Sequence, residues 1–185
     1  NPKMTSLLPS LLLASFLCIA RSCSDDDGGF IPQACRNSAA ANPTISYAAC
    51  VSSLQSAPAA ECANRRGLGV IAIALARDNA TDTRCYIRRT LRRGGWDQYQ
   101  RRCLEDCLEL YSDAIAGLGE ARASCRRGDL GSANAAVSAA MTGFVTCEDG
   151  FGDRAPPASP LTKRNGDAMH LSAVALSLIQ PLPRL

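Results

Sequence analysis

Four carboxylates on one helical stretch are the part of this sequence closest to a catalytic pattern. Glu105, Asp106, Glu109 and Asp113 are interspersed with apolar residues at helical spacing. A pair of carboxylates across a cleft is what glycoside hydrolysis requires. Arginines stand at 101 and 102, so the same residues also fit the solvated face of an amphipathic helix. We favour this second interpretation, in which the carboxylates face water.

The single histidine, His170, does not add a catalytic candidate. It lies in a helical pattern with no serine elbow or cysteine around it. The sequence contains no Gly-rich phosphate loop, HExxH or GxSxG motif. Glu148 and Asp149 lack the spaced oxygen ligands of a calcium loop. The sequence therefore predicts no catalytic residue, no metal site and no cofactor, and we expect a protein that is not an enzyme.

The start of the chain resembles a secretory signal peptide. The apolar run that follows Met4 is too short to span a bilayer and ends in small residues. We therefore expect residues 1–22 to be removed, with 1–3 as upstream sequence, and 23–185 to form one secreted domain. Their removal lowers the basic residues from 20 to 18 against 17 acidic ones, a net charge of about +1. This balance predicts no nucleic-acid partner, and no other apolar run predicts a membrane segment.

Ten cysteines in a secreted chain predict disulfides rather than metal ligands. Cys18 leaves with the signal peptide, and Cys23 depends on the cleavage site. In an antiparallel helical hairpin, facing residues are symmetric about the turn, and three cysteine pairs are symmetric about residues 94 and 127, where glycines predict turns. The fourth pair would staple a small N-terminal arm. The predicted disulfides are Cys35–Cys50, Cys62–Cys125, Cys85–Cys103 and Cys107–Cys147, of which Cys62–Cys125 requires Cys62 to lie at or before a helix start.

The elements that must position these residues are helical. Alanine is abundant and β-branched residues are sparse, which favours packed helices over a sheet. Apolar spacing predicts long helices at about 68–93, from 103 to the turn at 126–129, at 132–145 and at 161–179. Two short helical segments, near 30–35 and 46–54, precede them. We expect an all-α fold: an antiparallel up-and-down four-helix bundle with an N-terminal helical hairpin, stapled by disulfides.

Two further features could carry recognition or modification. Arginines crowd the end of the first long helix and the start of the next, where some of them balance the helix dipole. The alternative is affinity for an acidic partner or an acidic cell-wall polysaccharide; the clustered arginines are at 84, 88, 89, 92, 93, 101 and 102. Separately, Asn79-Ala80-Thr81 is an N-glycosylation sequon, which is occupied only if Asn79 faces solvent.

Several blocks of the chain together resemble the plant invertase/pectin methylesterase inhibitor family, over about residues 31–182. The resemblance is carried by the two cysteines around Asn42-Pro43 and Tyr47, and by the blocks at 67–72, 107–114, 138–141 and 146–151. The block at 159–165 is similar to the family branch that includes plane-tree pollen allergens. The family's two shared disulfides would correspond to Cys35–Cys50 and Cys107–Cys147, while the other four cysteines depart from its pattern.

This resemblance implies a secreted apoplastic inhibitor that docks over the active-site cleft of a plant cell-wall enzyme, either pectin methylesterase or acid invertase. Invertase inhibitors of the family are associated with a Pro-Lys-Phe motif near the third bundle helix, where this chain reads Gly128-Asp129-Leu130-Gly131-Ser132. One alternative is an allergen-type protein that kept the fold without inhibition. Another is a lipid-transfer-like protein, which we disfavour because the adjacent Cys-Cys and Cys-x-Cys steps are missing.

Overall fold

The computed structural model describes residues 30–152 and 159–180, and within these residues the chain is helical, without a strand. The signal peptide predicted at 1–22 and Cys23 lie outside the described residues, so that domain division stays a prediction. The elements in order are α1 (Phe30–Ala41), α2 (Tyr47–Gln55), the short 3₁₀ turn η1 (Pro58–Ala60), α3 (Arg65–Arg93), α4 (Gln98–Arg127), α5 (Leu130–Asp149) and α6 (Thr162–Ile179).

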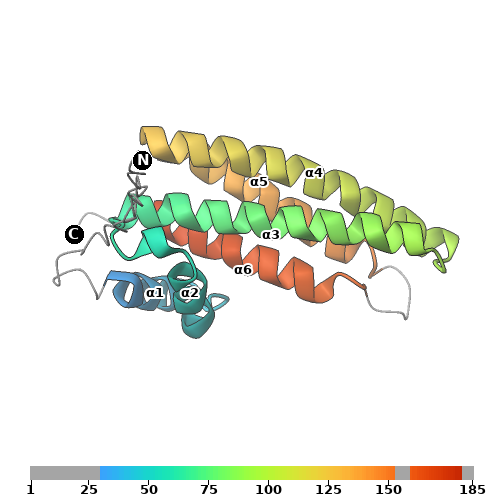
Figure 1. Cartoon of the computed structure of the whole chain (residues 1–185), viewed down its shortest axis with the longest axis horizontal. Coiled ribbons are helices and arrows are strands. Elements are labelled where there is room, and N and C mark those ends of the chain that lie inside the picture. The colour runs from blue at the N-terminus through green and yellow to red at the C-terminus, as the bar shows by residue number, and fades with distance from the viewer. Residues whose placement is uncertain (1–29, 153–158, 181–185) are drawn as a thin grey trace, which may run out of the picture.

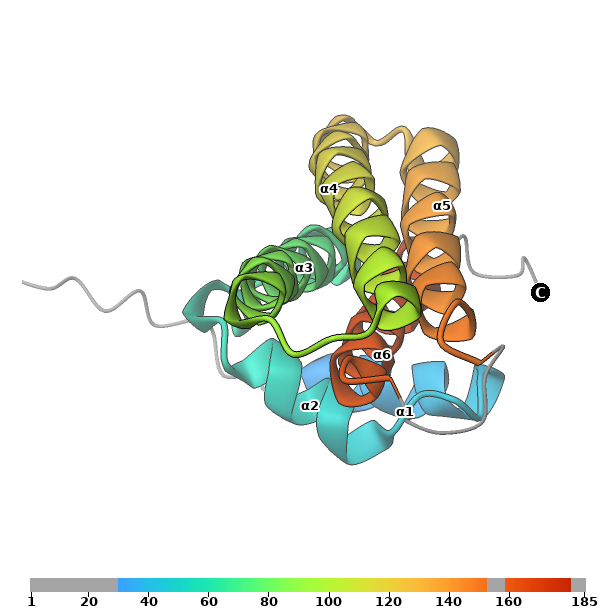
Figure 2. The ribbon, with the colours of Figure 1, turned by 90° about the vertical axis from the view of Figure 1, so that its right-hand side faces the viewer.

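Helices α3 to α6 form the predicted up-and-down bundle. Each packs against two neighbours, so that α3 contacts α4 and α6, while α5 contacts α4 and α6. Figures 1 and 2 show the four helices running side by side along the long axis of the molecule. The expected fold class is therefore confirmed.

Polar caps and glycines determine where the bundle helices begin and end. The side chains of Asn64, Asp97 and Asp129 each accept a backbone N–H from the first turn of the helix that follows. Gly94 and Gly128 end α3 and α4 with positive φ angles of 70° and 85°. The Asp129 cap starts α5 at Leu130, two residues earlier than the apolar pattern predicted, and α5 runs on to Asp149.

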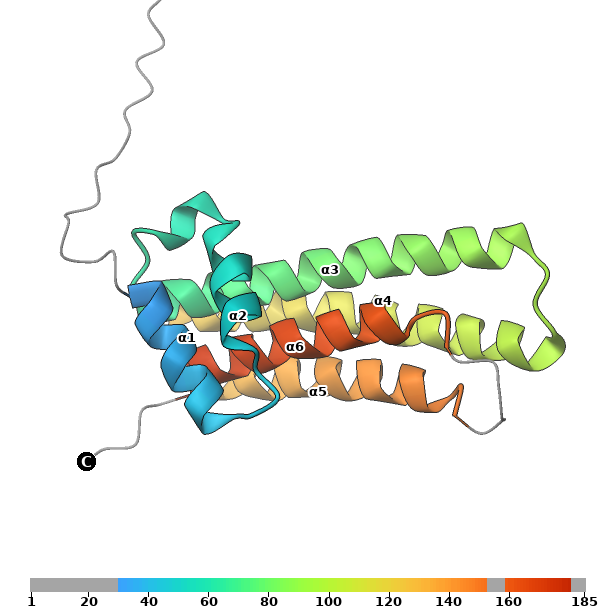
Figure 3. The same ribbon diagram turned by 90° about the horizontal axis from the view of Figure 1, so that it is seen from below.

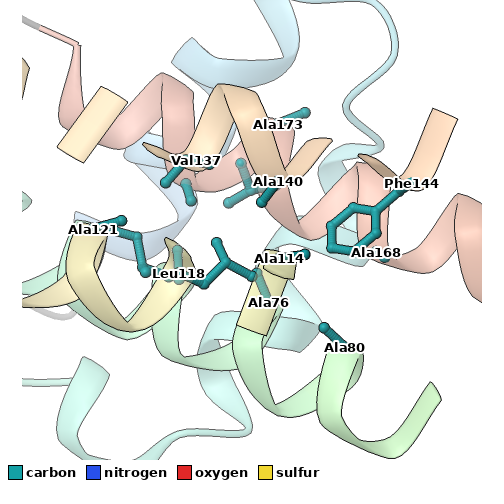
Figure 4. Close-up of a cluster of buried hydrophobic side chains, with 14 of the residues drawn as sticks. Ala76, Ala80, Ala114, Leu118, Ala121, Val137, Ala140, Phe144, Ala168 and Ala173 are labelled. Atoms are coloured by element: carbon teal, nitrogen blue, oxygen red, sulfur yellow. The ribbon is translucent and has the colours of Figure 1, made fainter. Parts of the chain in front are cut away.

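Small side chains let the bundle helices approach closely. Figure 4 shows alanines from all four helices filling the interior around a few larger residues, Leu118, Val137 and Phe144. The rings of Tyr111 and Phe144 pack with their centroids 4.9 Å apart, which joins α4 to α5. The core is thus built from alanine contacts with a few bulky residues between them.

A buried polar chain crosses the same interior. The Tyr111 hydroxyl donates to Asn165 Oδ1 at 2.6 Å, and Asn165 in turn donates to the Glu148 carboxylate. Tyr111 and Asn165 are almost fully buried. Burial raises the pKa of the Tyr111 hydroxyl above its usual value, and the nearby Thr83 hydroxyl opposes this only in part. These bonds connect α4, α5 and α6 at one level of the bundle.

The N-terminal hairpin lies across one end of the bundle, over α6 and the start of α3 (Figure 3). The Cys35–Cys50 disulfide joins α1 to α2, as predicted. His170 Nε2 on α6 accepts the backbone N–H of Ser46, the N-cap of α2, at 3.1 Å. Ser177 on the same helix donates to Ser38 on α1 at 2.7 Å. The disulfide therefore holds the hairpin together, and polar contacts fix it to α6.

Candidate functional site

The structure contains the predicted Cys107–Cys147 disulfide, which ties α4 to α5. It contradicts Cys85–Cys103, because both are free thiols. Cys103 is one turn from Cys107 and faces the same neighbour: its thiol donates to Gly150 O at the end of α5, at 3.1 Å. Cys85 is two residues from the buried Thr83 and Ile87, so it points away from the core and is exposed.

The predicted Cys62–Cys125 disulfide is also wrong, since Cys125 is a free thiol and Cys62 is bonded elsewhere. α3 ends at Arg93 and α4 begins at Gln98, so the midpoint of the hairpin lies between residues 95 and 96 rather than at 94. Cys125 consequently faces the first turn of α3, where its sulfur is 3.9 Å from Arg66 O. Burial raises the pKa of this thiol, while Arg66 partly opposes the shift, which makes Cys125 a poorly reactive packing residue.

No catalytic arrangement forms among the candidate residues that the structure describes. The four carboxylates at 105, 106, 109 and 113 are exposed on α4, as the solvated-face interpretation predicted. Glu105 pairs with Arg101 at 2.9 Å. His170 is used as an acceptor between the hairpin and α6. Within 30–152 and 159–180, no cluster of His, Cys, Asp or Glu could hold a metal ion, and none of the helices could cross a membrane.

Asn79 lies in the middle of α3 and is only partly exposed. Its Oδ1 atom is buried and makes no hydrogen bond. A glycan on Asn79 would be attached to Nδ2, so it would have to extend from that side of the amide while the backbone stays helical. Glycosylation at Asn79 stays a prediction.

The clearest candidate for recognition is a groove on the outer surface between α4 and α5. Its cavity volume is about 420 Å³. Most of the lining residues are small and come from both helices, and the polar ones are Asp113 and Glu120 of α4 and Thr142 and Thr146 of α5. A methyl group added at Gly117 or Gly143 would meet a neighbouring carbonyl oxygen at an ordinary 3.7 to 3.8 Å. The lining residues are Leu110, Asp113, Ala114, Gly117, Glu120, Ala136, Ala139, Ala140, Thr142, Gly143 and Thr146.

Both walls of this groove are held rigidly. The Cys107–Cys147 disulfide and the packed, mutually tilted rings of Tyr111 and Phe144 connect α4 to α5. Only Gly128 and Asp129 separate the two helices at the opposite end. Gly128 adopts the left-handed conformation and Asp129 caps α5, so this turn is tight and presents no projecting segment. A partner that enters the groove would meet a preformed surface, which reduces the entropy lost on binding.

The α4–α5 groove was not found by sequence reasoning. Its sequence signal was present: Ala136, Ala139, Ala140 and Gly143 place small residues along one face of α5 at helical spacing. The same pattern fits a tightly packed core face, so exposure could be decided only from the structure.

The chain is similar to known proteins both in sequence and in structure. The model of the plant invertase/pectin methylesterase inhibitor family matches residues 29–178. The chain is 36% identical over 170 residues to a protein of Platanus orientalis named "Putative invertase inhibitor", covering 92% of this chain and 98% of the relative. It is 34% identical over 126 residues to the "Pectinesterase inhibitor" of Actinidia deliciosa, covering 68% of this chain and 64% of the relative.

The structure is also similar to a solved one. The crystal structure of a mutant form of a pectin methylesterase inhibitor from Arabidopsis superposes with a TM-score of 0.64 at 26% identity, and the match covers 75% of this chain and 91% of that one.

Proposed function

Because this chain belongs to the plant invertase/pectin methylesterase inhibitor family, whose members are inhibitors rather than enzymes, we propose that it inhibits a pectin methylesterase by docking through the α4–α5 groove. The observation that carries the proposal is the groove itself, a preformed cavity between two disulfide-linked helices. Inhibition by docking needs a rigid complementary surface and no reactive group, which agrees with the absence of a catalytic arrangement in the described residues.

Pectin methylesterase is favoured over acid invertase by one local observation. The α4–α5 turn consists of Gly128 and Asp129, and the Pro-Lys-Phe sequence associated with invertase inhibition is absent there. A tight turn offers no loop for insertion into a deep active site. The helical groove instead suits a broad surface, and its carboxylates favour an enzyme face that carries basic side chains.

Acid invertase stays the second candidate, supported by the name of the Platanus relative. We also propose that residues 1–22 direct the protein to the apoplast, where both enzymes would be met. A non-inhibitory protein with the same fold is the third possibility, and one titration separates the three. The oxidised protein comprising residues 23–185 is titrated in parallel against a plant pectin methylesterase and an acid invertase.

Filling the groove tests where the enzyme docks. Ala139 is exposed on α5 and lines the groove, so Ala139→Trp inserts a large ring there without displacing a core residue. Ala123 is exposed on α4 and lies outside the groove, so Ala123→Trp is the matched control. We expect Ala139→Trp to weaken inhibition of pectin methylesterase about tenfold or more, as for a blocked interface centre, and Ala123→Trp to leave it unchanged.

Equal inhibition by both variants would exclude the groove as the docking site. Inhibition of invertase alone would transfer the proposal to that enzyme. No inhibition of either enzyme, with the disulfides intact, would favour the non-inhibitory protein.

A further inference from the structure

Helix α3 carries a large positive charge that the rest of the bundle does not share. It contains eight arginines and two aspartates over 29 residues, a net charge of +6. Helix α4 contains five arginines and five acidic residues. Helix α5 contains two acidic residues and no basic one. The charge of this nearly neutral protein is therefore strongly one-sided.

Four of these arginines form a row along one side of α3, which we call the arginine stripe: Arg77, Arg84, Arg88 and Arg92. They are seven, four and four residues apart, so they share a helix face and extend over about 22 Å. Arg77, Arg88 and Arg92 are exposed and Arg84 is partly exposed. Arg77 Nε donates to Ile115 O on α4 at 3.3 Å, which places the stripe beside the α3–α4 seam.

Helix α4 adds two arginines to the same seam. Gly119 lies against Arg77, since a methyl group added at Gly119 would be 3.6 Å from Arg77 Nε. Arg122 and Arg126 follow Gly119 by three and seven residues and therefore share its face. Arg126 is exposed, while Arg122 is partly buried.

No acidic side chain within the described residues forms an ion pair with the stripe. The ion pairs within the described residues are Arg101–Glu105, Lys163–Asp167 and Arg164–Asp82, and none includes a stripe arginine. The Nε atoms of Arg84 and Arg122 are buried and make no hydrogen bond. Like charges four residues apart destabilise a helix, and the helix dipole compensates only charges in the last turn, such as Arg92. Helix stability therefore does not explain this row.

We propose that the arginine stripe binds de-esterified pectin, a linear polymer of uronic acids, and so holds the inhibitor on the product of its target enzyme. The identity of this polymer rests on the proposed function, because a pectin methylesterase converts methyl esters into free carboxylates. The guanidinium fork matches a carboxylate with two parallel hydrogen bonds. A row of arginines suits a polymer that presents carboxylates at regular intervals.

A protein partner fits the arginine stripe less well. Binding hot spots between proteins usually include a large apolar or aromatic anchor. Among the described residues, Tyr47 is the one large hydrophobic side chain that is exposed, and it lies on α2. The stripe thus offers charge and hydrogen-bond donors without an apolar centre, as expected for a polyanion.

The stripe and the α4–α5 groove can be occupied together. In Figure 2, α3 and α5 lie on opposite sides of α4, so the two surfaces face different directions. The stripe lies at the seam of α3 with α4, whereas the groove lies at the seam of α4 with α5. Polymer binding would leave the enzyme-docking surface free.

The test compares retention of the oxidised protein on fully de-esterified and highly methyl-esterified pectin matrices over a salt gradient. Arg88→Glu with Arg92→Glu reverses two exposed charges of the stripe. Arg36→Glu with Lys163→Glu makes the same change in net charge at exposed positions on α1 and α6. We expect the protein to bind the de-esterified matrix more strongly, the stripe variant to bind it about tenfold more weakly, and the control to change less than threefold.

Inhibition of soluble pectin methylesterase on highly esterified substrate is measured for each variant, with circular dichroism as a folding check. Unchanged inhibition by the stripe variant, together with lost retention, supports the proposal. An inhibitor that is not retained, equal retention on both matrices, or binding of duplex DNA as strong as that of polyuronate would overturn it. Retention without inhibition of the enzyme would instead refute the proposed function while the stripe still binds polyuronate.

Discussion

The Tyr111 hydroxyl provides the sharpest test of how the bundle interior is held together. It donates to Asn165 Oδ1 at 2.6 Å, and Asn165 is 1% exposed. Tyr111→Phe keeps the ring that packs on Phe144 and removes only the donor. Asn165 Oδ1 would then be buried without a partner, because Asn165 also donates to Glu148 and cannot turn without breaking that bond.

The expected cost follows from that unpaired oxygen. Leaving a buried acceptor without its donor costs about 1–3 kcal/mol, so we expect Tyr111→Phe to lower the free energy of unfolding by about 2 kcal/mol. For a chain of this length, this corresponds to a fall in Tm of about 4–8 °C. With a urea m value of about 2 kcal/mol/M, the midpoint would fall by about 1 M.

Urea unfolding of the oxidised protein, followed by circular dichroism, measures this cost. Tyr47→Phe is the matched control, because Tyr47 is exposed and the same hydroxyl is removed there in contact with water. We expect this control to change the free energy of unfolding by less than about 0.5 kcal/mol. The double variant Tyr111→Phe with Asn165→Leu should lose about 1 kcal/mol less free energy of unfolding than the sum of the losses of the two single variants, since each substitution removes the same bond.

A Tyr111→Phe variant as stable as the Tyr47→Phe control would refute this reasoning. Strict additivity in the double variant would refute it as well, because the hydroxyl would then act independently of Asn165. A changed m value would indicate an altered denatured or native state instead of a lost hydrogen bond.

Three further predictions concern the Cys107–Cys147 disulfide, the contact between α3 and α6, and the loss of stability at high pH. Replacing Cys107 and Cys147 by alanine opens a loop of 40 residues and should cost about 4 kcal/mol by chain entropy, and unchanged urea unfolding would contradict this. Gly69→Ala should cost about 1–3 kcal/mol in the same assay, because the new methyl group would lie 2.7 Å from the buried Ile179 Cγ2; a neutral result would show that α3 and α6 can separate freely. Burial raises the pKa of Tyr111, so the folded state keeps this proton while the unfolded chain releases it above about pH 10; stability should therefore fall as pH rises from 9 to about 11, and less steeply in Tyr111→Phe.

Much of the fold could be predicted from the sequence, because it depends on short-range signals. Helical spacing of apolar residues identified four bundle helices, and the glycines at 94 and 128 marked the two tight turns between them. Antiparallel packing follows from such short connections. The same logic located Cys107–Cys147 across the short turn of Gly128 and Asp129, although the midpoint of that turn lies between residues 128 and 129 rather than at 127.

The other two predicted disulfides were wrong because they needed a precision that the sequence does not carry. Each residue turns a helix by about 100°, so an error of two residues in the midpoint of a hairpin changes which side chains face each other. The turn between α3 and α4 is not centred on its first glycine, and Cys125 therefore meets Arg66. Cys103 shares a face with Cys107, so it points to α5 instead of α3.

The recognition surfaces were decided only by the tertiary structure. Small residues on α5 fit a buried face and an open groove equally well in the sequence, and only the structure shows that they line a groove in which Ala139 is exposed while Ala140 is buried. The arginines of α3 were visible as a cluster, but only the fold shows that the arginine stripe makes no ion pair within the described residues and lies along the seam with α4. His170 and Asn165 likewise gained partners from Ser46 and Tyr111, which are far from them in the chain. Contacts of this kind depend on the depth and rotation of each helix in the bundle, which follow from all of the packing together.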